Sequence, residues 1–470
     1  MAKYDFIVIG GGSAGLTGAS FGAQLGAKTA LIEKHRIGGD CTWTGCVPSK
    51  TLRKVAIVAH QMRTAERFGL TAIEPRINFH AVMDHVRQTI QDIYQEESPE
   101  RLRTDGIDVF QGSARFLDTH TIDVDGQRLS GRNFLIASGA HPFIPTIAGL
   151  DLVQYDTYET IWNMDQLPAR MIILGGGPIG CEMAQALGRL GSRVTLVEGG
   201  DRLLSRDDLR SSQVIEKTFI EEGVALHLNA KVKRVWQDQT GIHVNIGDGE
   251  VAGDALLVAV GRKPNVSGLD LEEAGIKFSS NGIGVDMNLR TNQKHILAAG
   301  DCTGGYQFTH YAGWQAAIAA RNALLPGHSK GTTDLVPWTT FTDPEVAQVG
   351  LTEAQARAKY GDGVMTRDWP MSKVDRARAE VDTAGFLKII HKKDGTLLGV
   401  SIVAARAGEM INEWVIAMDR GLRAGDISSA IHVYPSYSVA NMQASAAIRI
   451  DQLLNGASGR VIRGLARLLG

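Results

Sequence analysis

Two widely separated segments of the chain share one order of hydrophobic and small residues. Each begins with a short continuous apolar run, at 6–9 and 172–174, as expected of a parallel strand that is buried on both faces. A glycine-rich turn follows, then a stretch rich in helix formers and small residues, and then a second short apolar run. The pattern predicts two β-α-β units, at 4–33 and 171–198.

The turns of both units have the same glycine spacing. The glycines are Gly10, Gly12 and Gly15 in the first unit and Gly175, Gly177 and Gly180 in the second, and Glu33 and Glu198 each lie 23 positions after the first glycine. The first glycine permits a tight turn, the second lets the backbone approach a pyrophosphate, and the third lets helix and strand pack closely. The phosphates sit at the positive end of the helix, and the terminal carboxylate accepts hydrogen bonds from a ribose. The chain therefore has two predicted dinucleotide sites.

The fold class that this pattern predicts is α/β, with two Rossmann-like dinucleotide-binding domains and a C-terminal α+β domain. Clusters of proline and glycine suggest a first binding domain at 1–148 and 267–335 and a second at 149–266. The remainder, 336–470, has no glycine fingerprint. Its periodicity predicts strands at 338–342, 385–390 and 397–403 and helices at 409–421 and 438–454.

Composition and charge restrict the partners. The 470 residues are 44% hydrophobic and 21% charged, which is ordinary for a folded protein with several cores. A formal net charge of −2 gives no general attraction for nucleic acid. No stretch approaches the roughly 20 apolar residues of a membrane span, and the N-terminus lacks a signal-peptide pattern. We expect a cytoplasmic protein with no membrane span and no nucleic-acid partner.

Two of the four cysteines, Cys41 and Cys46, lie close together in the sequence. Four cysteines in so long a chain do not form a disulfide scaffold, so the close pair indicates chemistry. The spacing allows closure within one distorted helical turn, and Lys50 favours a thiolate. A zinc site would need two further ligands, and neither a second CxxC nor a histidine pair accompanies the cysteines, so no metal site is predicted. Cys181 and Cys302 lie in packing segments and are expected to be buried and inert.

The segment 38–50 resembles the redox signature of class I pyridine nucleotide-disulfide oxidoreductases, the family of dihydrolipoamide dehydrogenase, glutathione reductase and mercuric reductase. Four further segments, 137–140, 259–265, 298–301 and 341–347, are similar to family motifs and occur in the family's order. The resemblance implies a homodimer in which electrons pass from NAD(P)H through FAD to a Cys41–Cys46 disulfide. A small-molecule or metal-ion acceptor then takes them. It also implies that Cys46 is adjacent to the flavin, that Cys41 meets the substrate, and that Lys50 pairs with Glu182 near the flavin.

The glycine pattern and the resemblance together give the cofactor-binding residues. Those predicted for FAD are Gly10, Gly12, Ser13, Ala14, Gly15, Glu33, Gly39, Lys50, Ala114, Ser138, Gly139 and Asp301. Those predicted for the nicotinamide dinucleotide are Gly175, Gly177, Ile179, Gly180, Glu198 and Gly261. NAD(H) is preferred over NADP(H), because Glu198 would repel a 2′-phosphate. Gly180, where NADP-specific relatives often have alanine, points the same way, while Arg202 and Arg206 leave NADP(H) open.

The chain departs from the family near its C-terminus. Disulfide reductases of the family carry a His-Pro-Thr-x-x-Glu segment, whose histidine comes from the partner subunit and acts as general acid and base. Here Tyr434 takes the histidine position and Val439 the glutamate position. A tyrosine with a pKa near 10 is a poor proton shuttle at neutral pH. His432 would share a face with Tyr434 on a strand. Either it takes over the catalytic role, or it is a partly exposed histidine at the dimer interface.

The sequence leaves the identity of the electron acceptor open. Residues 301–303 and 307–308 resemble mercuric reductases, which also lack the histidine, but those enzymes normally end in a vicinal cysteine pair and residues 463–470 contain none. The alternatives are a mercuric-reductase-like reductase of metal ions or quinones and a dihydrolipoamide-dehydrogenase-like component of a larger complex. The basic tail with Arg460, Arg463 and Arg467 is interpreted as a packed or frayed terminus, or as a segment that binds a membrane surface or a partner.

Overall fold

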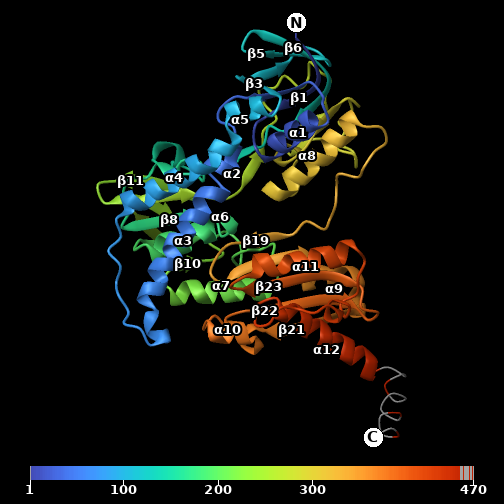
Figure 1. Ribbon diagram of the computed structural model, residues 1–470. Coiled ribbons are helices and arrows are strands. Elements are labelled where there is room, and N and C mark those ends of the chain that lie inside the picture. Colours follow the sequence, from blue (N-terminus) through green and yellow to red (C-terminus); the bar gives the residue numbers. More distant parts are fainter. Residues whose placement is uncertain (1, 456–458, 460–464, 466–467, 469–470) are drawn as a thin grey trace.

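The computed structural model describes residues 2–455, 459, 465 and 468 and arranges them in three units (Figure 1). The N-terminal unit lies at the top of Figure 1, the second dinucleotide unit below it to the left, and the C-terminal unit at the bottom. The predicted basic tail, with Arg460, Arg463 and Arg467, lies outside the described residues. Within the described part of the chain, no helix combines the length and the apolar character that a membrane span requires.

The N-terminal unit is built on a seven-stranded sheet with a parallel centre. β1 (Ala2–Ile9) pairs in parallel with β2 (Thr29–Glu33) and β6 (Gln127–Ile136), and β18 (Ile296–Ala298) pairs in parallel with the end of β6. β3 (Ile107–Gln111) extends the sheet beyond β2, while β5 (Thr121–Val124) and β4 (Ala114–Phe116) continue it antiparallel from β6. Helices α1 (Ser13–Gln24) and α8 (Thr309–Leu324) pack against each other beside it. Because β18 and α8 follow the second unit in the chain, this unit is completed only when the chain returns.

The second unit repeats the parallel arrangement in four strands. Their order is β10-β9-β8-β14, with bounds Ala225–His227, Arg193–Val197, Arg170–Leu174 and Ala255–Val258. Helices α6 (Pro178–Arg189) and α7 (Leu209–Glu221) accompany it. A small antiparallel sheet adds β11 (Arg234–Asp238), β12 (Gly241–Asn245) and β13 (Glu250–Gly253). The two chain crossings between the units, β7 (Ala140–Pro142) and β15 (Arg262–Pro264), pair antiparallel with each other.

The cysteine pair lies where two helices meet. Cys41 belongs to α2 (Gly39–Trp43), and Cys46 begins α3 (Cys46–Arg63). The expectation of a single distorted helical turn is therefore wrong. The chain breaks at Gly45, where a Cβ would lie 2.8 Å from the carbonyl oxygen of Asp40, so only glycine permits the bend. α3 then packs on α4 (Phe79–Glu97), which is followed by α5 (Pro99–Thr104), and on α6 of the second unit.

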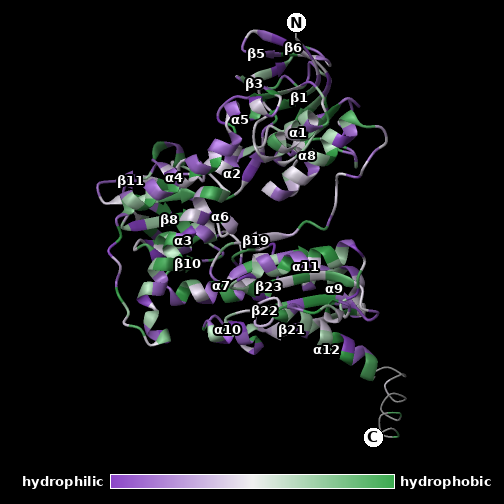
Figure 2. Cartoon of the chain, viewed as in Figure 1, coloured by the Kyte–Doolittle hydropathy of each residue, from purple (hydrophilic) through white to green (hydrophobic). Residues whose placement is uncertain are grey.

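The C-terminal unit is an antiparallel sheet covered by helices. Its strand order is β19-β20-β23-β22-β21, with bounds Trp338–Thr340, Glu345–Gly350, Leu397–Ala404, Phe386–Lys392 and Val364–Pro370. The helices are α9 (Glu353–Tyr360), α10 (Asp375–Ala379), α11 (Ala407–Asp419) and α12 (Val439–Asn455). In Figure 2 hydrophobic residues follow the strands, while the helices alternate between hydrophobic and hydrophilic residues, as expected of helices that cover a core. The predicted strands and helices of this unit are present; the domain limits stay predictions.

Candidate active site

The two glycine-rich turns have nearly the same backbone geometry. Gly10 has a φ of +107° and Gly175 a φ of +108°. A Cβ at Gly10 would lie 2.2 Å from the carbonyl oxygen of Ala137, and one at Gly175 would lie 2.5 Å from that of Ala259. The third glycines are just as restricted, because a Cβ at Gly15 or Gly180 would collide with the backbone of the first glycine of its own turn. These glycines hold the helix close to its strand, which leaves the N-terminus of the helix open for a phosphate.

The carboxylates at the ends of β2 and β9 also repeat each other. Glu33 accepts hydrogen bonds from the backbone N–H groups of Gly11, at 2.6 Å, and His35, at 2.7 Å. Glu198 accepts them from Gly176 and Gly200, both at 2.6 Å. Each carboxylate therefore ties its glycine turn to the loop that follows the second strand. Carboxylate oxygens have further acceptor capacity, so both remain suited to a ribose.

A cavity of about 800 Å³ runs along the first glycine turn. It collects the following residues predicted for FAD: Gly10, Gly12, Ser13, Ala14, Glu33, Gly39, Ala114, Ser138, Gly139 and Asp301. Cys41 and Thr309 line it as well. Gly12 and Gly39 face each other across the turn, and a Cβ at Gly39 would lie only 2.7 Å from the Cα of Gly12. A cavity of this volume, lined by both a glycine-rich phosphate cradle and a thiol, fits FAD. Gly15 and Lys50 lie outside this lining.

An arginine that the sequence pattern did not single out holds one wall of the cavity. Arg262, from the segment after β14, forms ion pairs with Asp301, at 2.8 Å, and with Asp40 beside the cysteine pair. The phenol of Tyr158 donates to Asp40 at 3.2 Å. Burial raises the pKa of Asp301, and the neighbouring guanidinium opposes that shift. Arg262 thus joins three segments that are far apart in sequence. Its only sequence signal was its place in the 259–265 motif.

The two thiols lie within hydrogen-bonding distance of each other and are not equivalent. Their mutual hydrogen bond and burial raise the pKa of Cys41 well above its usual value. The same hydrogen bond lowers the pKa of Cys46 to about 6, against an opposing effect of burial. The hydroxyl of Thr309, 3.3 Å from Cys46 Sγ, and the charge of Lys50 lower it further. Thr309 is the first residue of α8 and was not predicted as a site residue. The arrangement favours a thiolate on Cys46 and a protonated Cys41.

Lys50 and Glu182 meet as expected. Lys50 Nζ lies 2.9 Å from Glu182 Oε2, with 36% of the lysine side chain and 9% of the glutamate side chain exposed. Glu182 Oε1 accepts the backbone N–H of Phe341 at 2.9 Å. The ion pair therefore joins α3, α6 and the C-terminal unit.

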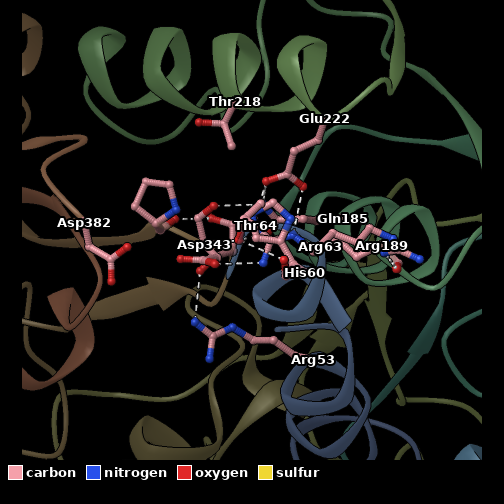
Figure 3. A network of polar contacts seen from close by, with 12 residues as sticks. Arg53, His60, Arg63, Thr64, Gln185, Arg189, Thr218, Glu222, Asp343 and Asp382 are labelled. Carbon is pink, nitrogen blue, oxygen red and sulfur yellow. Dashed lines mark hydrogen bonds and ion pairs between the residues drawn. The ribbon is translucent and has the colours of Figure 1, made fainter. Parts of the chain in front are cut away.

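A buried polar network holds these three segments together further along α3 (Figure 3). Arg189 forms ion pairs with Glu222 and, at 2.7 Å, with Asp343. The side chain of Gln185 accepts the backbone N–H of Asp343 and donates to its carbonyl oxygen. Arg53 of α3 donates to the carbonyl oxygen of Thr342 at 3.1 Å. The network fixes the positions of α3 and α6, and hence of Lys50 and Glu182, against residues 341–343.

The predicted nucleotide residues gather at the second glycine turn. Gly175, Gly177, Ile179 and Gly180 form the turn and the start of α6, and Glu198 closes it from β9. Gly261 lies two residues beyond Ala259, whose carbonyl oxygen faces Gly175. The guanidinium of Arg202 donates to the carbonyl oxygens of Ser205 and Asp207.

The C-terminal segment differs from the expectation in one respect. Residues 430–438 form no strand, so the expected shared face of His432 and Tyr434 is wrong. Tyr434 is 66% exposed and donates to Asp375 at 3.0 Å, which raises the pKa of the phenol. His432 turns instead toward α11, where its Nε2 lies 2.6 Å from Glu413 Oε1 and its Nδ1 lies 3.0 Å from the carbonyl oxygen of Ala430. Both ring nitrogens of His432 have partners.

The remaining cysteines behave as expected of packing residues. Cys181 and Cys302 are fully buried, and their thiols donate to backbone carbonyl oxygens. Among residues 2–455, 459, 465 and 468 no group of three or more histidine, cysteine, aspartate or glutamate side chains is arranged to hold a metal ion.

Known proteins resemble the chain along most of its length. Residues 4–316 match the family model described as pyridine nucleotide-disulphide oxidoreductase, and residues 336–444 match the dimerisation domain of that family. A mercuric reductase from Bacillus cereus is 35% identical over 92% of this chain and 69% of its own length. A dihydrolipoyl dehydrogenase from Geobacillus stearothermophilus is 32% identical over 94% of this chain and 95% of its own.

Solved structures agree with these matches. The Cu(II) complex of the HOCl-induced flavoprotein disulfide reductase RclA from Escherichia coli superposes with a TM-score of 0.86 at 31% identity. The match covers 95% of this chain and 100% of that one. LpdA from Mycobacterium tuberculosis superposes with a TM-score of 0.87 at 30% identity, over 95% of this chain and 100% of that one. The predicted α/β fold class is confirmed, and the dimerisation-domain match supports a homodimer.

Proposed function

We propose that this chain, which belongs to the pyridine nucleotide-disulphide oxidoreductase family, passes electrons from NADH through FAD and a Cys41–Cys46 pair to a metal-ion acceptor. Members of this family are FAD-dependent oxidoreductases, and the predicted enzyme class is confirmed by the matches. The acceptor, the preference for NADH and the roles of individual residues are our proposals. We place the reaction in the cytoplasm, where a dithiol can cycle between its redox states.

The observation that carries the proposal is the difference in pKa between the two thiols, which is lowered for Cys46 and raised for Cys41. FAD, when bound, accepts hydride from a reduced nicotinamide and supplies two electrons to a disulfide. On this chain, Lys50 and Thr309 hold negative charge on Cys46 Sγ, next to the cavity. Cys41 Sγ keeps its proton and is the sulfur that meets the acceptor. Oxidation of this thiolate–thiol pair forms one S–S bond and releases the proton of Cys41 and two electrons, which reduce two one-electron metal ions or one two-electron ion.

The C-terminal segment supports an acceptor other than an ordinary disulfide. Thiol–disulfide exchange in this family uses a histidine as general acid and base, and Tyr434 stands at that position here. His432 offers no free ring nitrogen, because Glu413 and Ala430 occupy both. A metal ion is reduced without transfer of a proton to a leaving thiol, so it does not need this group. Relatives named mercuric reductase and the Cu(II) complex of RclA support the same class.

Glu198 supports NADH rather than NADPH. Its carboxylate lies at the end of β9, tied to Gly176 and Gly200, where the adenosine ribose of a bound dinucleotide would lie. A 2′-phosphate there would meet a like charge. Arg202 keeps its charge, but its guanidinium is held by hydrogen bonds to the carbonyl oxygens of Ser205 and Asp207.

Steady-state oxidation of NADH and NADPH against an acceptor panel tests this proposal. The panel contains cupric and mercuric ions, quinones, lipoamide and oxidised glutathione. We expect metal-dependent turnover to exceed disulfide turnover, and Cys41→Ser and Cys46→Ser to abolish it, while Cys181→Ser serves as the matched cysteine control. Lipoamide turnover above that with metal ions would instead select a component of the dihydrolipoyl dehydrogenase type. Metal-dependent turnover that survives both substitutions would show that the dithiol is not on the path.

A further inference from the structure

Phe341 contacts both members of the ion pair beside the cysteines. Its backbone N–H donates to Glu182 Oε1 at 2.9 Å, and Lys50 Nζ lies 4.4 Å from the centroid of its ring. Glu182 thus uses one oxygen for Phe341 and the other for Lys50. The ammonium group of Lys50 has a carboxylate, the ring face and, at 3.3 Å, Ser49 Oγ as its partners on the chain.

The ring has a fixed position of its own. Phe341 follows β19 directly, and the buried network of Arg53, Gln185 and Arg189 holds the next two residues. On another side the ring lies close to α11, because a Cβ at Gly408 would be 3.4 Å from it, an ordinary van der Waals contact. The aromatic face is therefore held against the ammonium group by the C-terminal unit rather than by α3, which carries Lys50.

We infer that Phe341 is a positioning residue, which places the charge of Lys50 through a cation–π contact and through its hydrogen bond to Glu182. A lysine side chain has four rotatable bonds, and a salt bridge alone leaves it considerable freedom. The negative face of an aromatic ring attracts the cation and excludes water from one side of it. The C-terminal unit thereby sets how strongly Lys50 favours negative charge in the FAD cavity and on Cys46.

This inference rests on the proposed role of Lys50, and its test separates the two. The variants are Phe341→Leu, Phe341→Tyr, and pentafluorophenylalanine at position 341, which keeps the shape of the ring but reverses the charge of its face. Each is also made with Lys50→Met. Tyr360→Leu is the matched control, because Lys392 Nζ lies 4.5 Å from that ring, away from the cysteines. The readouts are the flavin midpoint potential, the rate of flavin reduction by NADH, and the unfolding temperature of the FAD-free protein.

We expect Phe341→Leu and the fluorinated ring to shift the flavin potential to more negative values. Flavin reduction should slow by roughly fivefold to tenfold, the size that a partly desolvated cation–π contact supports. Phe341→Tyr should retain wild-type values. In the Lys50→Met protein, substitutions at position 341 should no longer change the flavin midpoint potential. The effects of Lys50→Met and of the substitutions at position 341 on the unfolding temperature of the FAD-free protein should not be additive.

Two outcomes overturn the inference in different ways. A wild-type potential in both Phe341→Leu and the fluorinated protein, together with a shifted potential in Lys50→Met, would show that the ring does not position the lysine. An unchanged potential in Lys50→Met would overturn the role of Lys50 itself and this inference with it. The fluorinated protein decides the question if Phe341→Leu fails to fold.

Discussion

The hydroxyl oxygen of Thr309 lies 3.3 Å from the sulfur of Cys46, although 263 positions separate the two residues in the chain. Thr309 begins α8, so both the hydroxyl and the positive end of that helix face the thiol. The contact exists only because β18 and α8 return to the N-terminal sheet after the second dinucleotide unit. Together with the hydrogen bond from Cys41, which has the larger effect, and the charge of Lys50, this contact lowers the pKa of Cys46.

The acidity of Cys46 should follow the hydroxyl of Thr309. We expect two-electron reduction to give a long-wavelength thiolate-to-flavin absorption band, present above the pKa of Cys46 and lost as the pH falls through about 6. Thr309→Val should move the midpoint upward by about one pH unit, because a hydrogen bond to a charged group is worth about 1.5 kcal/mol or more. Thr309→Ser keeps the hydroxyl and is the control. A midpoint unchanged in Thr309→Val would contradict this account of the thiolate.

Discrimination between NADH and NADPH should depend on the charge of Glu198. Glu198→Gln removes the charge and keeps an acceptor for one of the two backbone N–H groups, those of Gly176 and Gly200, so the turn should be weakened only in part while the repulsion of a 2′-phosphate is lost. We expect the ratio of kcat/KM for NADH to that for NADPH to narrow by roughly tenfold, about 1.4 kcal/mol. Arg202→Ala should change the ratio little. A wild-type preference for NADPH would refute the argument.

Disulfide reduction should improve when the histidine of the family is restored. Tyr434→His places an imidazole near Asp375, which already accepts the phenol and can orient the ring. General acid–base assistance is typically worth about 10² to 10⁴-fold, so lipoamide and glutathione turnover should rise while flavin reduction by NADH stays constant. His432→Ala should leave disulfide turnover unchanged, because both nitrogens of His432 are engaged. A large loss in His432→Ala would show that this histidine does the work instead.

The buried charge of Asp207 should make the folded protein less stable at neutral and higher pH than at acidic pH. It is buried, and its carboxylate accepts the indole N–H of Trp338 at 2.9 Å. Burial raises its pKa to about 7; Trp338, Arg202 and Arg206 oppose the shift and Asp208 adds to it. Because the folded pKa exceeds the unfolded value near 3.8, stability falls as the pH rises from about 4 to about 7, by on the order of 4 kcal/mol, and is then constant.

Asp207→Asn keeps the acceptor for Trp338 without the buried charge. It should therefore raise the unfolding temperature at pH 8 and change it little at pH 4.5, and the exposed Asp201→Asn should do neither. Thermal unfolding of both variants at the two pH values checks this. An equal gain at both pH values would mean that ionisation is not the cause.

The sequence alone determined those features whose physical cause is local. The glycine turns at 10–15 and 175–180 are readable because a positive φ and a close helix–strand contact both demand glycine. The positions of Glu33 and Glu198 could be predicted from the sequence because the length of one helix and one strand fixes their distance from the glycine turn. The close spacing of Cys41 and Cys46 likewise indicated their chemistry. In the C-terminal unit β19, β22, β23, α11 and α12 followed from periodicity, whereas β20, β21, α9 and α10 were not predicted.

Only the tertiary structure decided which distant groups meet. Thr309 at Cys46, Arg262 between Asp40 and Asp301, and Phe341 at Lys50 join segments that become neighbours when three sheets are packed together. The same holds for His432, whose ring turned toward Glu413 because residues 430–438 form a bend in place of the expected strand. Periodicity and spacing report the environment along one element. The partner of an exposed or half-buried polar side chain depends on which other element is packed beside it, and no local pattern encodes that.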